Sequence, residues 1–229
     1  MTHGKKFRAA FEKIDPAKVY TASEAIAFLK EHPMAKFDES VEIHIHLGIN
    51  TKKSDEAIRG TVILPHGSGR AKKVAVVTTA KEKEAKEAGA DFVGGETLIE
   101  DIKSGKVLPG THFDVVLATP EMMPKLAQVA KVLGPKGMMP SPKTETVTAK
   151  IGETVEMLKK GKKIAFKNDD TANLHQVVGK LSFEAKALEE NLEALLGTIE
   201  KMKPEGLKGK FLASITLSST MGPGLPISR

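Results

Sequence analysis

Near the end of the chain, four hydroxyl side chains recur at every second position: Ser214, Thr216, Ser218 and Thr220. Residues two apart on a β-strand point to the same side, so a strand through residues 211–219 would present the first three as a row, which Thr220 joins if the strand continues. Hydroxyls bond to ribose 2′-hydroxyls and phosphates without carrying charge, which suits recognition of RNA by its shape. Ordinary sheet surface is the alternative interpretation, because threonine is a good strand former.

A rigid turn follows this row directly. In MGPG (221–224) the proline fixes the backbone, and the glycines allow a ligand to approach it closely. The stretch 216–228 contains no charged residue, although the whole chain has a net charge of +6. We therefore interpret the stretch as a contact surface, and we expect Lys36, Lys163 and Lys167 to supply salt-dependent attraction to a polyanion.

Two other glycine-rich segments do not fit a nucleotide site. A dinucleotide-binding loop has its glycines after a strand and before a helix, but in HGSGR (66–70) they precede an apolar strand. GPKGMMPSPK (134–143) lacks the Lys-Ser/Thr pair of a P-loop, and its three prolines remove backbone donors. This second segment, with Lys136 and Lys143, is either a structural crossover or a loop that contacts phosphate.

Little in the sequence suggests catalysis or metal binding. His44 and His46 share the polar face of an alternating strand, but a zinc site needs a further ligand, and spacing identifies none. We expect both histidines to face solvent or RNA. There is no cysteine, no His-Glu-x-x-His and no nucleophile elbow. The sequence therefore predicts no enzyme, no cofactor and no metal.

The composition fits a basic cytoplasmic protein with a nucleic acid partner. Lysine and arginine exceed aspartate and glutamate by 35 to 29. The absence of tryptophan, with one tyrosine, argues against base stacking on an aromatic platform. No apolar run spans a bilayer, the N-terminus lacks the apolar core of a signal peptide, and the lack of cysteine suits a reducing compartment.

Two kinds of strand occur in a definite order. Near both ends, 40–49, 161–168 and 211–219 alternate apolar and polar side chains, as in an antiparallel sheet with one exposed face. In the last of them, the apolar face would hold Phe211, Ala213, Ile215 and Leu217.

The middle of the chain has a different pattern. The runs 73–79 and 113–120 are apolar throughout, and helical patterns cover 80–90, 96–105 and 121–134, as in a parallel doubly wound sheet.

This order predicts the fold class α/β, with an α+β split domain made from both chain ends and an inserted parallel α/β domain. The predicted limits are 1–67 with 158–229 for the split domain and 68–157 for the inserted one. Hinges are expected near 65–70 and 152–161, where glycines lie close to the two chain crossings. A single mixed sheet is the alternative.

Long stretches of the sequence resemble the bacterial large-subunit ribosomal proteins of the L-one (universal L-one) family. The resemblance runs almost end to end and is carried by HGKKFRAAFEKID, AKFDESVEIHIHLGI, RGTVILPHGSGR, FDVVLATPEMM, VLGPKGMMPSPKTETV, IAFKNDDTANLHQVVGKLSF and KPEGLKGKFLASITLSSTMGPG. Together these strings are highly specific. Two residues depart from the family pattern: Ser141 stands where Asn is more usual, and Glu145 where Gly is more usual.

The resemblance implies a structural constituent of the large ribosomal subunit. It implies a split RNA-binding domain that binds the 23S rRNA stalk beside the tRNA exit (E) site, and a Rossmann-like three-layer inserted domain without nucleotide chemistry. It also implies help in releasing deacylated tRNA and repression of translation through the protein's own operon mRNA. The implied partners are thus the 23S rRNA stalk, exit-site tRNA and that mRNA, and the protein is implied to be monomeric outside the ribosome.

The RNA contacts of the family carry over to three segments of this chain. Glu42 would accept a hydrogen bond from a ribose hydroxyl or base amine, and Phe37 would pack on a sugar or base. The complete set implied by the resemblance is Lys36, Phe37, Ser40, Glu42, Lys167, Asn168, Asp169, Thr171, Ser214, Thr216, Ser218, Thr220, Met221 and Gly222.

Two other functions stay open at this point. A nucleotide-dependent enzyme on the middle domain would rest on the α/β pattern alone. A general duplex binder would act through charge and would lack any preference for sequence or shape.

Overall fold

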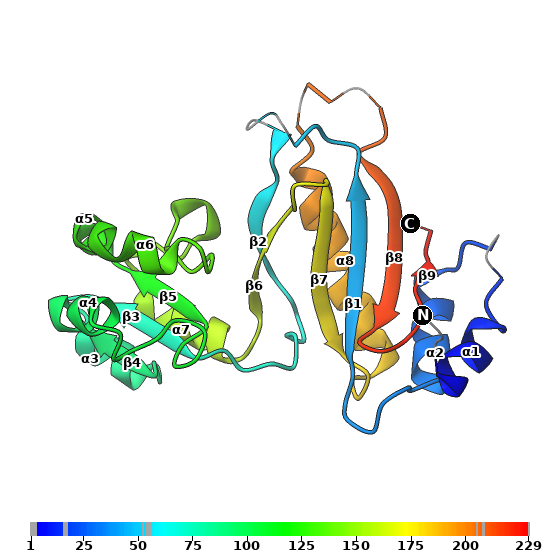
Figure 1. The fold of residues 1–229 in the computed structure, drawn as a ribbon, viewed down its shortest axis with the longest axis horizontal. Coiled ribbons are helices and arrows are strands. Elements are labelled where there is room, and N and C mark those ends of the chain that lie inside the picture. The colour runs from blue at the N-terminus through cyan, green and yellow to red at the C-terminus, as the bar shows by residue number, and fades with distance from the viewer. Residues whose placement is uncertain are drawn as a thin grey trace. The chain divides into compact units, whose positions relative to one another are not determined.

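The computed structural model describes residues 4–15, 18–51, 53, 56–204, 206–207 and 209–228. The chain forms two compact units, one from Met1–Gly69 with Phe166–Arg229 and one from Arg70–Ala165 (Figure 1). We call the first the two-segment unit and the second the inserted unit. The domain limits predicted above, 1–67 with 158–229 and 68–157, stay a prediction.

The two-segment unit is built on a four-stranded antiparallel sheet with the strand order β7-β1-β8-β9. Strands from both ends of the chain therefore share one sheet, as the alternating patterns predict. A separate two-stranded sheet pairs β2 with β6. The elements are α1 (Lys5–Phe11), α2 (Ala22–Glu31), β1 (Ser40–Leu47), β2 (Arg59–Ile63), β7 (Asn173–Lys180), α8 (Ala185–Lys201), β8 (Leu212–Ser219) and β9 (Leu225–Pro226). Strand β6 (Lys163–Lys167) begins in the inserted unit and ends in the two-segment unit.

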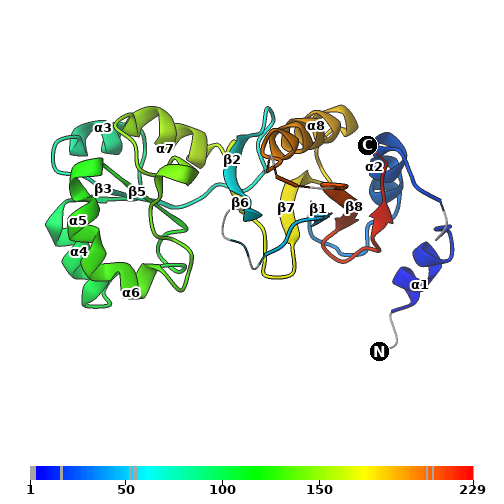
Figure 2. The same ribbon diagram turned by 90° about the horizontal axis from the view of Figure 1, so that it is seen from above.

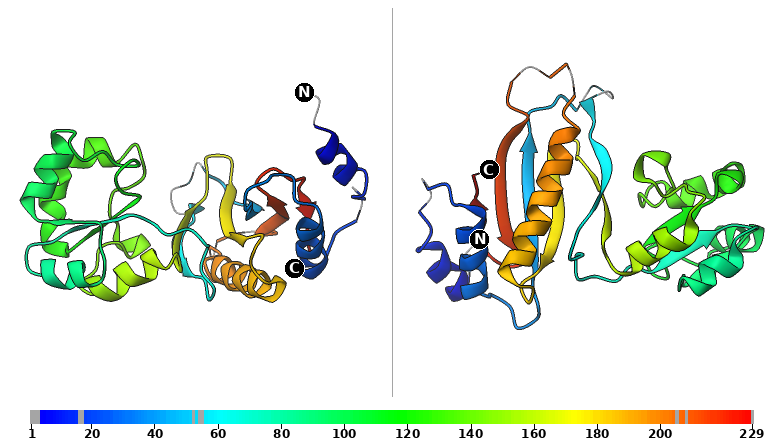
Figure 3. Two further views of the ribbon diagram at one scale, coloured as in Figure 1. Left: turned by 90° about the horizontal axis from the view of Figure 1, so that it is seen from below. Right: turned by 180° about the vertical axis from the view of Figure 1, so that it is seen from behind.

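Helices α8 and α2 cover one face of the four-stranded sheet (Figure 3). Every second residue of β1 is buried toward them, and each large apolar side chain buried in this way contributes roughly 1.5–3 kcal/mol. The opposite face carries the alternate residues of each strand. The buried residues on this side include Val41, Ile43, Ile45, Leu47, Leu188, Leu192, Leu195 and Ile199.

The predicted apolar face of β8 is wrong at one position. Ile215 and Leu217 are buried as expected, but Ala213 is exposed. The register with β1 shifts there, since His46 pairs with Ser214 while Leu47 pairs with Leu212. Ala213 is thus the extra residue of a β-bulge, which the alternating pattern alone does not reveal.

The inserted unit contains a parallel three-stranded sheet with the order β4-β3-β5. Apolar clusters fill both faces of this sheet, and Figure 2 shows α3 and α7 on one side, with α4 and α5 on the other. This confirms the predicted three-layer arrangement and excludes a single mixed sheet. The elements are β3 (Val74–Val77), α3 (Glu82–Glu87), β4 (Phe92–Gly94), α4 (Glu96–Lys103), β5 (Val115–Ala118), η2 (Pro120–Met122), α5 (Met123–Leu126), η3 (Ala127–Val129), α6 (Ala130–Leu133), η4 (Pro142–Thr144) and α7 (Ile151–Lys159).

The single helix predicted over 121–134 is instead a series of short α- and 3-10-helical turns from η2 to α6. Pro124 lies at the start of α5, where its missing N–H removes a donor from the continuous hydrogen-bond ladder. In the following loop, the ammonium group of Lys136 donates to the carbonyl of Pro109. This contact gives Lys136 a structural role in the loop.

Glu145 and Lys163 form an ion pair within the inserted unit. Glu145 has a φ of 47°, in the left-handed region that glycine adopts without strain, and Gly is the residue that the family resemblance implies at this position. Its carboxylate lies 2.7 Å from the ammonium nitrogen of Lys163, whose side chain is buried. Lys163 is therefore not a surface charge for a polyanion, and that prediction is wrong.

Asn191 ties the segment before residue 70 to the core. Its side chain is fully buried; Oδ1 accepts from the His66 N–H at 3.1 Å, and Nδ2 donates to the carbonyls of Gly67 and Val178, both at 2.9 Å. These bonds hold the 66–67 backbone against α8 and β7, where buried polar groups need partners.

Asn191→Leu is expected to lower the free energy of unfolding by at least about 2 kcal/mol, because three backbone groups, two of them buried, lose their partner. The check is urea denaturation followed by circular dichroism. The exposed Glu193 on the same helix provides the control, since Glu193→Ala should change stability by less than about 0.5 kcal/mol. An unchanged midpoint for Asn191→Leu would contradict this role.

Candidate RNA interface

The uncovered face of the four-stranded sheet carries three cross-strand rows of side chains. The pairing of β7, β1 and β8 aligns Val177 with Glu42 and Ser218, His175 with His44 and Thr216, and Asn173 with His46 and Ser214. None of the nine is buried. The structure thus brings four predicted contacts, Glu42, Ser214, Thr216 and Ser218, onto one surface, which we call the open face.

Glu39 organises the end of the open face where β1 begins and β8 ends. Its side chain has no exposed surface. One carboxylate oxygen accepts from the N–H groups of Met34 and Ala35 at 2.7 and 2.6 Å, and the other accepts from the Ser219 hydroxyl at 2.6 Å and the Met221 N–H at 3.2 Å. One side chain therefore connects the loop before β1 to the turn after β8. We call this set of contacts the Glu39 clamp.

The clamp keeps Glu39 ionised. Burial by itself raises the pKa of a carboxyl, but the hydrogen bonds from Ser219, Ala35, Met221 and Met34 outweigh burial and hold the pKa of Glu39 below its usual value. Hydrogen bonds to a charged group each contribute about 1.5–3 kcal/mol, so the clamp offsets the cost of burying the charge.

Two further contacts join the same loop and turn. Thr220 Oγ1 accepts from the Ser40 N–H at 2.9 Å, and the Thr220 N–H donates to the Ser40 carbonyl at 3.0 Å. A Cβ added to Gly222 would lie 2.5 Å from the Ser219 hydroxyl oxygen, which is already bonded to Glu39. Ser40, Thr220 and Gly222 therefore have a structural role: they help to join the loop before β1 to the turn after β8. We call this loop and turn, with the Glu39 clamp, the joint.

This joint presents three predicted contacts to solvent. Lys36 is exposed, and the side chains of Phe37 and Met221 are 59% and 58% exposed, the two largest values among the large hydrophobic residues of the described chain. The clamp bonds the backbone of Met221 directly, and Phe37 lies in the short segment between Ala35 and Glu39, which the clamp joins. Phe37 and Met221 are therefore accessible to a partner that binds at this end of the open face.

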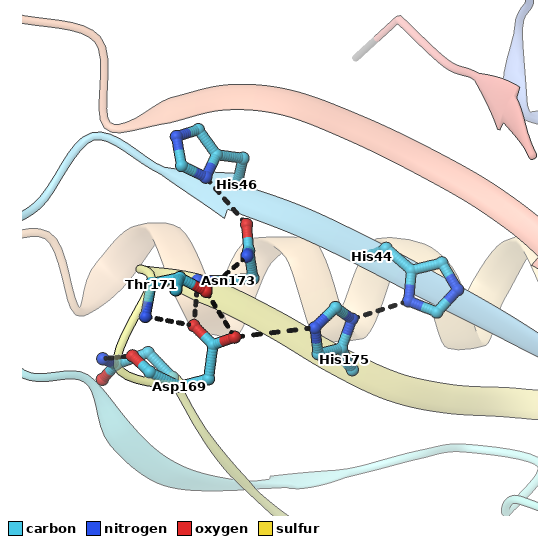
Figure 4. A network of polar contacts seen from close by, with 7 residues as sticks. His44, His46, Asp169, Thr171, Asn173 and His175 are labelled. Carbon is cyan, nitrogen blue, oxygen red and sulfur yellow. Dashed lines mark hydrogen bonds and ion pairs between the residues drawn. The ribbon is translucent and has the colours of Figure 1, made fainter.

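A second turn, residues 168–172, lies at the other end of the open face, about 23 Å away along β1. Asp169 accepts from the N–H groups of Thr171 and Asn173 at 2.9 and 2.7 Å and from the Thr171 hydroxyl at 2.7 Å (Figure 4). These bonds, led by the Thr171 hydroxyl, hold the pKa of Asp169 below its usual value. The hydrogen bonds of Asp169 make the turn rigid. Asp169 and Thr171 are both exposed, so the turn is also accessible to a partner.

Asn168 and Lys167 differ in exposure. Asn168 is 6% exposed; its Oδ1 accepts from the Ile58 N–H at 2.8 Å and its Nδ2 donates to the Asp169 carbonyl at 2.8 Å. Its side chain therefore supports the turn, which differs from the direct contact implied by the family resemblance. Lys167 is exposed at the end of β6.

Several residues of this surface were not predicted from the sequence to belong to it. Glu39 and Ser219 sit at positions where the alternation of β1 and β8 points inward, and polar residues at such positions signal a buried partner. Asn173 and His175 belong to β7, a strand that the sequence analysis did not identify. His175 lies beside His44 and Asn173 beside His46, as Figure 4 shows.

The surface has the composition of a binding site. Among the residues that the structure describes, no group of three His, Asp or Glu side chains is arranged to hold a metal ion. Within the same ranges, no helix has the length and apolar character needed to cross a membrane. The open face offers hydroxyl, imidazole, amide and carboxylate groups, which suit hydrogen bonding to ribose and phosphate.

Comparisons with known proteins identify the family of the chain. The model of the ribosomal protein L1p/L10e family matches residues 29–223. The chain is 48% identical over 224 residues to the large ribosomal subunit protein uL1 of Kosmotoga olearia, with 97% of this chain and 95% of that protein covered. It is 47% identical over 228 residues to the protein of the same name from Thermus thermophilus, with 99% and 97% covered. Proteins of this family are structural and non-enzymatic.

Glu39→Gln is expected to lower the free energy of unfolding by about 2–3 kcal/mol at pH 7, because the amide lacks the charge and turns a donor toward other donors. A depressed pKa means that the ionised carboxylate stabilises the fold above its ordinary pKa and that this contribution disappears as pH falls through the folded-state pKa. The difference between wild type and variant should therefore shrink in acid.

Urea denaturation from pH 3 to pH 8 measures this difference. Glu31→Gln is the matched control, since Glu31 is exposed at the end of α2. A difference that stays constant over the whole pH range would show that the charge of Glu39 does not stabilise the joint.

Proposed function

Because the chain belongs to the ribosomal protein L1p/L10e family, we propose that it is a constituent of the large ribosomal subunit that binds the stalk region of 23S rRNA next to the tRNA exit site. The proposed contact surface is the open face with the loop and turns at its two ends. The protein acts in the cytoplasm as part of the ribosome and is a monomer outside it.

The make-up of the open face is the observation that carries this proposal. Its rows contain no lysine or arginine, so charge alone does not explain the surface. Hydroxyl, amide and imidazole groups match the ribose and phosphate atoms exposed in the shallow groove of folded RNA. Lys36 at one end and Lys167 next to the turn at the other supply the electrostatic attraction.

Phe37 and Met221 give the proposed interface its apolar anchors. Both side chains are more than half exposed; the Met221 N–H donates to Glu39, and Phe37 lies two residues from both Ala35 and Glu39, which are bonded to each other. Packing these side chains on sugars or bases buries apolar area that stays in water otherwise. A preorganised support means that little ordering is needed on binding.

Two further roles rest on family membership. We propose that the protein helps deacylated tRNA leave the exit site, and that it represses translation by binding its own operon mRNA. An mRNA that displays the shape of the rRNA stalk would occupy the same open face, so the two RNAs would compete for one surface.

The proposal is tested by measuring affinity for the stalk fragment of 23S rRNA against a scrambled duplex of equal length, over a salt series. We expect a preference of at least about a hundredfold that persists at high salt, because hydrogen bonds and shape are screened less than charge. Equal affinity for both RNAs, lost together as salt rises, would leave only charge-driven duplex binding.

Met221→Ala is expected to weaken binding to the stalk fragment about tenfold and to leave binding to the scrambled duplex unchanged, since a tenfold loss corresponds to about 1.4 kcal/mol. The fold should persist because only backbone atoms of Met221 join the clamp. Leu108→Ala is the control, as Leu108 is 45% exposed in the inserted unit. Wild-type affinity in Met221→Ala would remove this side chain from the interface.

A further inference from the structure

Three histidines lie on the open face, and two of them, His44 and His175, are in direct contact. His44 Nδ1 lies 2.8 Å from His175 Nδ1, and His44 Nε2 lies 3.0 Å from the hydroxyl oxygen of Ser218. On the other side of the pair, His175 Nε2 is 4.0 Å from a carboxylate oxygen of Asp169. The third ring, His46, is 2.8 Å from the side-chain oxygen of Asn173. A continuous chain of groups therefore runs from Asp169 to Ser218.

The Nδ1 to Nδ1 contact limits this pair to a single added proton. A hydrogen bond between two imidazole nitrogens needs one donor and one acceptor, so the two facing atoms share one proton. If His175 donates, its Nε2 is free to take up a proton facing Asp169, and no hydrogen bond is lost. A second proton on His44 Nδ1 would break the contact and place two cations side by side.

The surroundings favour His175 as the place for that proton. Burial first, and then the neighbouring charge of His175, lower the pKa of His44, although Glu42 acts in the opposite direction. Of the three histidines, only His175 has a carboxylate oxygen within 4.0 Å among the residues that the structure describes.

The charge of the open face therefore depends on one imidazole. The titratable groups of the face are Glu42, His44 and His46 on β1, His175 on β7 and Asp169 in the turn before it, while β8 contributes only hydroxyls. With neutral histidines, these groups contribute only the negative charges of Glu42 and Asp169, which oppose a polyanion; the exposed Asp170 in the same turn and Lys167 before it carry opposite charges. One proton on His175 neutralises half of this charge and adds a cationic donor.

We propose that binding of folded RNA to the open face takes up one proton, held on His175 between His44 and Asp169, so that affinity rises as pH falls from 8 to 6. This inference rests on the proposed function and adds a proton-linked RNA contact to it. Imidazole is the side chain whose charge changes in this pH range. An approaching phosphate stabilises the cation, and by linkage the cation stabilises the bound RNA.

The test measures the affinity of the full-length protein for the stalk fragment and for the scrambled duplex at pH 6, 7 and 8 and constant ionic strength. We expect the stalk affinity to rise about tenfold from pH 8 to pH 6, the change produced when binding shifts one pKa by one unit. Calorimetry at pH 7 in two buffers of different ionisation enthalpy should show net proton uptake on binding.

Three variants assign the proton. His175→Gln should remove both the pH dependence and the proton uptake, while His46→Gln should keep the pH dependence whatever its effect on affinity. His66→Gln is the matched control, because His66 pairs with Glu190 away from the open face, and it should behave as wild type. Urea midpoints confirm that each variant is folded.

The outcomes separate the inference from the proposed function. Specific binding with equal affinity at all three pH values would overturn the inference and keep the function. Persistence of the pH dependence in His175→Gln, or its loss in His46→Gln, would also overturn the assignment to His175. No preference for the stalk fragment at any pH would overturn the proposed function, and the inference with it.

Discussion

The carboxylate of Glu39 lies without any exposed surface between the loop that leads into β1 and the turn that follows β8. Its four hydrogen bonds, from Met34, Ala35, Ser219 and Met221, satisfy a charge that would otherwise be costly to bury. Removing this carboxylate would leave two segments, 180 positions apart in the chain, without their common partner. The placement of the exposed Phe37 and Met221 depends on it.

The same kind of contact, a side chain that accepts hydrogen bonds from backbone N–H groups, recurs at the other end of the surface. Asp169 accepts hydrogen bonds from the backbone of its own turn, as Glu39 does from the loop before β1 and the turn after β8. Each end of the open face therefore has a carboxylate that accepts backbone N–H groups. Between them, the three rows are set by strand register. A rigid surface of this kind with few charges suits the recognition of RNA by its shape that we propose, because hydrogen bonding is screened less by salt than charge and a preorganised surface needs little ordering.

Much of the fold was predictable from local patterns. Alternation in 40–49 and 211–219 identified an antiparallel sheet with one exposed face, and the apolar runs 73–79 and 113–120 identified the parallel sheet. The failures have physical causes. A bulge exposes Ala213, Pro124 interrupts a helix, and Lys163 is buried in an ion pair with Glu145. Each of these features depends on a residue distant in sequence or on a local break in the element, and the periodicity of the sequence shows neither.

By itself the sequence determined the α/β class and the family. It also determined which side of each alternating strand most residues occupy, because the twofold repeat of a strand is a local property of the chain, but it missed the bulge at Ala213. It placed Ser214, Thr216 and Ser218 on one side but did not show what lies beside them. Only the tertiary structure decided that Glu39 meets Ser219 and that His44 meets His175, since these contacts follow from the register between strands far apart in sequence, which the packing of the whole sheet on its helices sets.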